Sequence, residues 1–378
     1  HIVDEGDYDE VPLYKKRDKV YPKRVSGRFR NLKWFALIAL LAIYWVVPWL
    51  RWDRGPSAPD QAVLIDMDLG RAYFFFIEIW PQEVYYITGI LIMAAVGLFL
   101  ATSLFGRIWC GYACPQTVWT DLFMLVERYI QGDRNARVRL DKSKWTLEKI
   151  WKISATHLAW IVISMATGGA FVLYFHDAPT VMVDIFTANA TFGTYVTIAF
   201  LTGSTYLLAG WAREQVCTYM CPWPRFQSAM LDDESMIVTY ESWRGETRGP
   251  IKRKNLVRGE VPETGHCIDC HACVNVCPTG IDIRDGLQLE CIGCGLCIDA
   301  CNEMMDKVGF PRDLVRFDSV QNSQLRSQGK ATRVRIIRPR TIFYSLLLVI
   351  IAVVMMFGLA NRSVLELNVL RDRNPLFV

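Results

Sequence analysis

The chain has 378 residues, of which 52% are hydrophobic and 12% aromatic, and its mean hydropathy is +0.18. A chain of this length can hold several structural units, but its long apolar runs exclude an ordinary soluble protein and indicate segments that lie in lipid. The net charge of +4 gathers beside the apolar runs. That pattern is typical of membrane topology and argues against a nucleic-acid partner.

Five apolar runs are long enough to cross a bilayer. They cover residues 34–50, 84–105, 155–175, 194–211 and 341–360. We interpret residues 34–211 as a four-helix transmembrane core and residues 341–360 as a fifth transmembrane helix. Residues 66–79 look amphipathic and are expected on the far surface of the membrane.

The connecting segments alternate in their content of Lys and Arg. Residues 1–33 contain nine, residues 51–83 three, residues 106–154 nine and residues 176–193 none. Because Lys and Arg are in excess in cytoplasmic loops, we expect residues 1–33, 106–154 and 212–340 in the cytoplasm. The C-terminal segment then lies on the opposite side.

Eight cysteines form two matching runs between residues 266 and 302. In each run three cysteines are separated by two residues, and a fourth follows after three more. Bacterial-type ferredoxins hold two 4Fe–4S clusters with this spacing, and the fourth cysteine of each run ligates the other run's cluster. The spacing predicts one cluster on Cys267, Cys270, Cys273 and Cys301, and a second on Cys291, Cys294, Cys297 and Cys277.

Structural zinc and disulfides are the alternatives for these eight cysteines. Zinc sites use two CxxC pairs, often with histidine, and leave the triple-cysteine turns unexplained. Disulfides need an oxidising compartment, whereas the topology places this segment in the cytoplasm. The sequence therefore predicts an α-helical membrane protein with five transmembrane helices and an inserted two-cluster ferredoxin domain of the α+β class, within residues 212–340.

The remaining four cysteines form an internal repeat. Cys110-Gly-Tyr-Ala-Cys114-Pro115 follows the second apolar run, and Cys217-Thr-Tyr-Met-Cys221-Pro222 follows the fourth, 107 positions later. On a helix, CxxxC places two thiols on one face, one turn apart, and a following proline suits the first position of a new helix. The four thiols could converge on a metal, an iron–sulfur cluster or a redox dithiol, or could be buried reduced cysteines at helix ends.

Paired CxxxCP motifs followed by an eight-cysteine ferredoxin resemble the NapH/NosR/FixG group of membrane polyferredoxins. A fifth span after the ferredoxin resembles the FixG/RdxA/CcoG branch, accessory proteins of cbb3-type cytochrome oxidase assembly, over residues 27–371. The resemblance implies a bacterial inner-membrane protein whose C-terminal region is periplasmic. Members of this branch usually continue into an external β-sandwich domain, whereas this sequence stops at Val378. Residues 361–378 are therefore interpreted as the start of the periplasmic region.

The same resemblance implies an electron carrier that reduces Cu(II) to Cu(I) for the oxidase's copper centre. In this hypothesis the two clusters relay electrons, and the reductive or copper-handling site is formed by Cys110, Cys114, Cys217 and Cys221. The implied partners are a cytoplasmic electron donor, copper ions, and oxidase assembly factors or a copper transporter or chaperone. A homodimer is compatible with this hypothesis. The alternatives are a quinol-linked membrane carrier that feeds a periplasmic reductase, and a non-enzymatic assembly scaffold.

Overall fold

The computed structural model describes residues 19–56, 58–250 and 265–361. Five helices in this part of the chain are long and apolar enough to cross a membrane: Arg28–Trp49, Pro81–Phe105, Leu147–Val172, Phe192–Ala212 and Pro339–Ala360. They confirm the predicted fold class, although the third begins eight residues before the predicted run. The predicted periplasmic segment lies, apart from Asn361, outside the described residues, and so do residues 1–18 of the N-terminal region.

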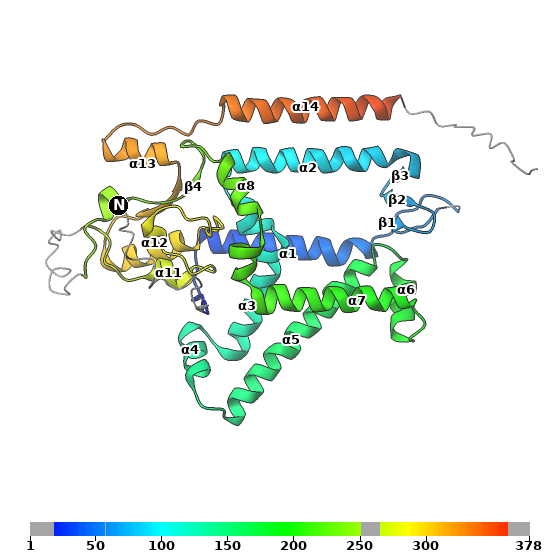
Figure 1. Ribbon diagram of the computed structural model, residues 1–378, viewed down its shortest axis with the longest axis horizontal. Coiled ribbons are helices and arrows are strands. Elements are labelled where there is room, and N and C mark those ends of the chain that lie inside the picture. The colour runs from blue at the N-terminus through cyan, green and yellow to red at the C-terminus, as the bar shows by residue number, and fades with distance from the viewer. Residues whose placement is uncertain (1–18, 57, 251–264, 362–378) are drawn as a thin grey trace, which may run out of the picture.

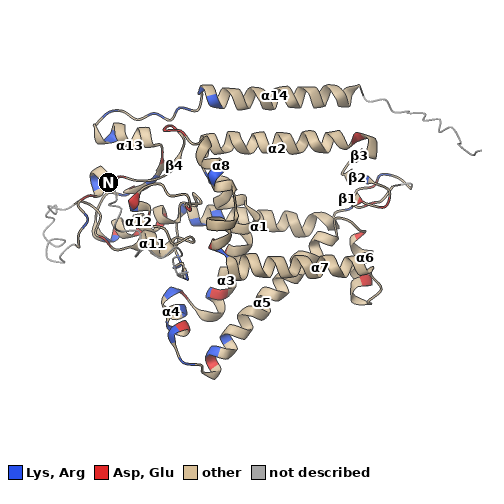
Figure 2. Cartoon of the chain, in the orientation of Figure 1, with Lys and Arg blue, Asp and Glu red and all other residues tan. Residues whose placement is uncertain are grey.

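The spanning helices pack in pairs. Helix α2 (Val84–Phe105) lies along α14 (Pro339–Ala360), and α5 (Leu147–Val172) packs against α7 (Phe192–Thr205) (Figure 1). Helix α1 (Arg28–Val46) runs between these pairs in the view of Figure 1. The charged residues gather at the ferredoxin end and at the opposite ends of the helices, so the spanning segments are almost entirely uncharged (Figure 2). Exposed apolar side chains on such segments are expected to face lipid.

The loops at the helix ends away from the ferredoxin unit are folded. Residues 63–79, which include the stretch predicted to be amphipathic, form an antiparallel sheet of β1 (Val63–Asp66), β2 (Arg71–Phe74) and β3 (Ile77–Ile79). The fully buried side chain of Gln61 donates to the carbonyl oxygens of Val63 and Leu173 and accepts from the backbone N–H of Ala178. This amide joins the sheet to α6 (Ala178–Phe186), so the two loops form one cap.

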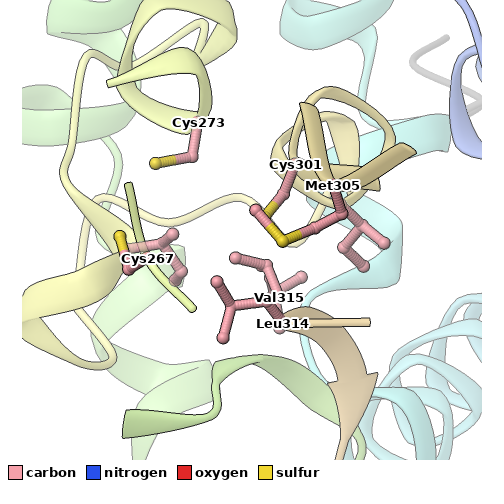
Figure 3. Close-up of a cluster of buried hydrophobic side chains, with 9 residues drawn as sticks. Cys267, Cys273, Cys301, Met305, Leu314 and Val315 are labelled. Carbon is pink, nitrogen blue, oxygen red and sulfur yellow. The ribbon is translucent and has the colours of Figure 1, made fainter. Parts of the chain in front are cut away.

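The ferredoxin unit is built from short elements around cysteine side chains. Strand β4 (Ile237–Tyr240) pairs antiparallel with β5 (Val315–Asp318), and α11 (Ala272–Val276) packs against α12 (Leu296–Val308). Figure 3 shows Cys267, Cys273 and Cys301 around one space, with Met305, Leu314 and Val315 closing the other side. The described elements of the unit are completed by α9 (Ser242–Gly245), the 3-10 turn η6 (Ile283–Asp285) and α13 (Val320–Ser327).

The N-terminus of α1 docks the ferredoxin unit onto the membrane helices. Asp299 of α12 accepts hydrogen bonds from the backbone N–H groups of Phe29 and Arg30, at 3.3 and 2.8 Å. It therefore replaces the side-chain cap that Gly27 cannot supply, and its charge is favourable at a helix N-terminus. The guanidinium of Arg30 also reaches both oxygens of Asp121 at 3.0 Å. Asp121 belongs to α3 (Pro115–Gln131), and both side chains of this pair are buried.

Candidate metal centres and the four-thiol site

Two cavities in the ferredoxin unit are lined by the two predicted cysteine sets. The first is lined by Cys267, Cys270, Cys273 and Cys301. The second is lined by Cys277, Cys291, Cys294 and Cys297, with Cys273 at its boundary. The fourth cysteine of each run therefore lies with the other run's first three. The assignment of individual thiols to individual irons stays a prediction.

The cavities fit iron–sulfur clusters in chemistry as well as in composition. Every cysteine is a free thiol, and the walls between the thiols are apolar, with Val238, Ile283 and Ile292 in the second cavity. Within the described ranges, no three His, Cys, Asp or Glu side chains lie close enough together to hold one metal ion. A cluster does not need three side chains around one ion, because each thiolate of a cubane binds a different iron.

The two CxxxCP motifs fold in the same way. Each occupies a π-turn, Trp109–Ala113 in the first and Val216–Met220 in the second. The backbone N–H of Cys114 donates to Trp109 and that of Cys221 to Val216, both at 2.8 Å. Each turn follows a residue with positive φ, Gly106 at 60° and Arg213 at 45°. These two residues are also 107 positions apart, so the sequence repeat is a structural repeat.

The prediction that each CxxxC lies on an α-helix is wrong. Cys114 and Cys221 leave the helical conformation, with ψ values of 128° and 121°, because the residue before a proline is disfavoured in the α region. Pro115 begins α3 as predicted, whereas Pro222 is the residue before α8 (Trp223–Met230). The π-turns replace the single helical turn that the spacing suggested.

The four thiols of the repeat lie near enough to interact electrostatically, since Cys114, Cys217 and Cys221 all act on Cys110. The Sγ of Cys110 donates to Oε1 of Gln227, at 3.1 Å, and Gln116 Nε2 donates to the carbonyl oxygens of Leu208 and Arg213. Each half is thus held by an amide side chain of the other. Burial, together with the neighbouring thiols of both motifs, raises the pKa of the Cys110 and Cys217 thiols to about 12. We call Cys110, Cys114, Cys217 and Cys221 the four-thiol site.

The four-thiol site touches the wall of the second ferredoxin cavity. A Cβ atom on Gly111 would lie 2.9 Å from the carbonyl oxygen of Ile292 and 3.1 Å from Cα of Cys294. The hydroxyl of Tyr112 donates to the carbonyl oxygen of Cys294, at 2.9 Å, and Cys110 packs against the same turn. No side chain separates the two backbones at this point, which places the four-thiol site beside the second predicted cluster.

Arg107 lies buried at the same junction. Its guanidinium donates to the carbonyl oxygens of Leu289, Cys291 (3.1 Å) and Pro224 (3.0 Å), while its Nε has no hydrogen-bond partner among the described residues. From the sequence, Arg107 was counted among the basic residues that set the topology, and was expected as a nearby cation to favour thiolate at the CxxxCP cysteines. Gln227 carried no signal at all, because its role depends on the packing of one half against the other.

Replacing Gly111 by alanine should separate the two backbones. The added methyl group meets main-chain atoms that cannot rotate away, so we expect overpacking to cost about 1–3 kcal/mol and to lower the thermal unfolding midpoint in detergent. The EPR signal of the second cluster should change and that of the first should not. Gly97→Ala in α2 is the matched control, because a Cβ atom there meets nothing within 4 Å. Equal behaviour of the two variants would contradict the close contact.

Comparison with known proteins gives the family. A family model described as "4Fe-4S dicluster domain" matches residues 212–320, and one described as "4Fe-4S binding domain" matches residues 87–130. The chain is 53% identical to the nitrogen fixation protein FixG of Rhizobium meliloti, over 97% of this chain and 75% of that protein. It is also 53% identical to protein RdxB of Cereibacter sphaeroides, over 97% of this chain and 77% of that protein.

Another relative is more distant. The ferredoxin-type protein NapH of Haemophilus influenzae is 26% identical over 57% of this chain and 67% of its own length. No solved structure matches the chain. The resemblance inferred from the cysteine motifs is thereby confirmed: the chain belongs to the FixG/RdxA family and is a membrane iron–sulfur electron-transfer protein.

Proposed function

We propose that this protein passes electrons from its ferredoxin unit to the four-thiol site and there reduces Cu(II) to Cu(I), which is supplied to the copper centre of a cbb3-type cytochrome oxidase. The observation that carries the proposal is the direct contact between the turn of Cys110 and the turn of Cys294. An electron that reaches the second cavity is one short step from four soft thiols. Soft thiols are the ligands that favour Cu(I).

The chain's own residues have separate tasks in this reaction. When bound, the clusters supply one-electron storage and transfer, over potentials from about −700 to +450 mV. Arg107 and Tyr112 hold the second cavity against the four-thiol site, and Gln227 accepts the S–H of Cys110. Each Cu(II) takes one electron and becomes Cu(I). From the low-potential end of the range this transfer is downhill.

The proposal includes the position of the reaction relative to the membrane. The four-thiol site lies at the same end of the helices as the ferredoxin unit, and basic residues flank that end (Figure 2). By the positive-inside rule this end faces the cytoplasm of a bacterial inner membrane. The electron donor is then cytoplasmic, and Cu(I) leaves through a copper chaperone or transporter or through oxidase assembly factors.

Exchanging Cys110 and Cys217 together for serine should abolish copper reduction. The prediction is a loss of Cu(I) production, measured anaerobically with a Cu(I) chelator, while the EPR signals of both ferredoxin clusters remain. Serine fills nearly the same space but is a poor ligand for soft metal ions. Cys270→Ser is the comparison, since it should remove a ferredoxin signal. Full copper turnover in the double variant would refute the proposal.

A groove beside the first cavity favours a second candidate, a quinol-linked membrane carrier that feeds a periplasmic reductase. The groove is lined by Phe29, Leu32, Phe35, Ile298 and Phe317, with Arg28 and Arg316 among its polar residues. Ile298 lies in the core that holds Cys267, Cys273 and Cys301, and Phe29 and Phe317 pack against that core. A quinol at this membrane edge could release two electrons, one for each cluster.

Filling the groove tests this candidate. A quinol analogue should reduce the clusters rapidly in detergent, and Leu32→Trp should slow that reduction by blocking the groove. Ile38→Trp is the matched control, because Ile38 is exposed on the same helix but does not line the groove. Failure of the analogue to reduce the wild-type clusters, or equal slowing by both variants, would count against a quinol site here.

A further inference from the structure

We propose that Cys110, Cys114, Cys217 and Cys221 together hold a third 4Fe–4S cluster. The inference rests on the proposed function for the direction of electron flow and changes one part of it: the four thiols ligate a cluster, and that cluster, not the thiols themselves, passes the electron to Cu(II). The presence of the cluster does not require that copper be the final acceptor. The ligand set is drawn from both halves of the repeat, so neither CxxxCP motif could hold the cluster alone.

The number and origin of the thiols fit a cluster. Iron–sulfur clusters are commonly held by four cysteine thiolates, and the two matching π-turns each present two. Gln116 of one half donates to the carbonyl oxygen of Arg213 in the other, and Cys110 lies 3.1 Å from Gln227 Oε1, so the turns lie against each other. All four thiols are half-buried, so a group between them would be partly shielded from water.

A single-ion site explains the same residues less well. No three His, Cys, Asp or Glu side chains in the described part of the chain are close enough to share one ion. The eight ferredoxin cysteines form no such group of three either, although they lie in the segment that matches the 4Fe–4S dicluster domain. The four thiols are therefore like the ferredoxin cysteines in forming no compact three-ligand group. A two-coordinate Cu(I) ion would leave two of the four thiols without a role.

Two buried cations lie between the four-thiol site and the second cavity. Arg107 interacts electrostatically with both Cys110 and Cys291, and Lys33 with both Cys217 and Cys294. Both side chains are at least 95% buried, and the Nε of Arg107 has no partner. An unpaired buried donor is costly, and the sulfur of a cluster is an acceptor that would satisfy it. The carboxylate of Glu214, which interacts with Cys217, offsets part of the positive potential of these two cations.

The family comparison supplies an independent observation. The segment 87–130 matches a 4Fe–4S binding domain, yet it contains only Cys110 and Cys114. Two thiolates do not complete a cluster. In the structure the missing pair is Cys217 and Cys221, which the sequence places more than eighty residues after this segment.

Iron and acid-labile sulfide per chain test the inference. Anaerobically purified, reconstituted protein should contain about twelve irons, against about eight for the ferredoxin unit alone. The variants Cys110→Ser/Cys114→Ser and Cys217→Ser/Cys221→Ser should each lose about a third of the iron, because either pair is needed. Met220→Leu, between Cys217 and Cys221, is the control and should keep the full count. In both pair variants the EPR signals of the ferredoxin clusters should persist, which shows that the chain has folded.

Two outcomes separate this inference from the proposed function. About eight irons in the wild type, unchanged in both pair variants, would overturn the third cluster, even if the variants no longer reduced copper. About twelve irons, with loss of a third in each pair variant, would support the third cluster, even if the wild type failed to reduce copper.

Discussion

The contact between the Gly111 backbone and the turn from Ile292 to Cys294 is the constraint on which the rest of the structure depends. Two main chains approach so closely that even a methyl group does not fit between them. One of these two segments carries thiols of the CxxxCP repeat, and the other carries thiols of the second ferredoxin cavity. Because electron transfer weakens steeply with separation, this approach supports the proposed transfer of electrons between the two sets of cysteines. Without it, the chain would hold a ferredoxin and a membrane anchor with no path between them.

Buried charged side chains fix the ferredoxin unit against the membrane helices. Asp299 caps α1, and Arg30 of α1 pairs with Asp121 of α3, so one helix N-terminus fixes the ferredoxin unit and the helix that follows the first CxxxCP motif. On the other side of α3, the carboxylate of Glu127 forms ion pairs with Arg137 and Arg213, with N–O distances of 2.9 and 3.1 Å. Buried ion pairs contribute little net stability, because desolvation offsets their attraction. We interpret them here as devices that specify one arrangement of the helices around the four-thiol site.

Much of this arrangement could be predicted from the sequence. Apolar length gave the five spanning helices, and cysteine spacing gave the two sets that line the ferredoxin cavities, because both signals arise from local chemistry. Contacts between distant segments left no such signal. The role of Gln227 depends on how the two halves of the repeat pack against each other. The sequence alone does not show that the backbone at Gly111 lies against another segment of the chain. The proline after each motif was interpreted as a helix start, and its effect on the backbone conformation of the preceding cysteine was missed.

Iron-edge anomalous diffraction from crystals of the anaerobically purified protein would test the adjacency of the two sites most directly. The contacts of Gly111, Tyr112 and Arg107 predict iron peaks in both ferredoxin cavities, with the peak of the Cys291 cavity nearer to the four thiols. Side chains of Cys110 and Cys217 should face each other beside that peak. Peaks in the reverse order, with the Cys267 cavity nearer to the four thiols, would contradict the electron path described here, and so would CxxxCP turns that face away from the ferredoxin unit.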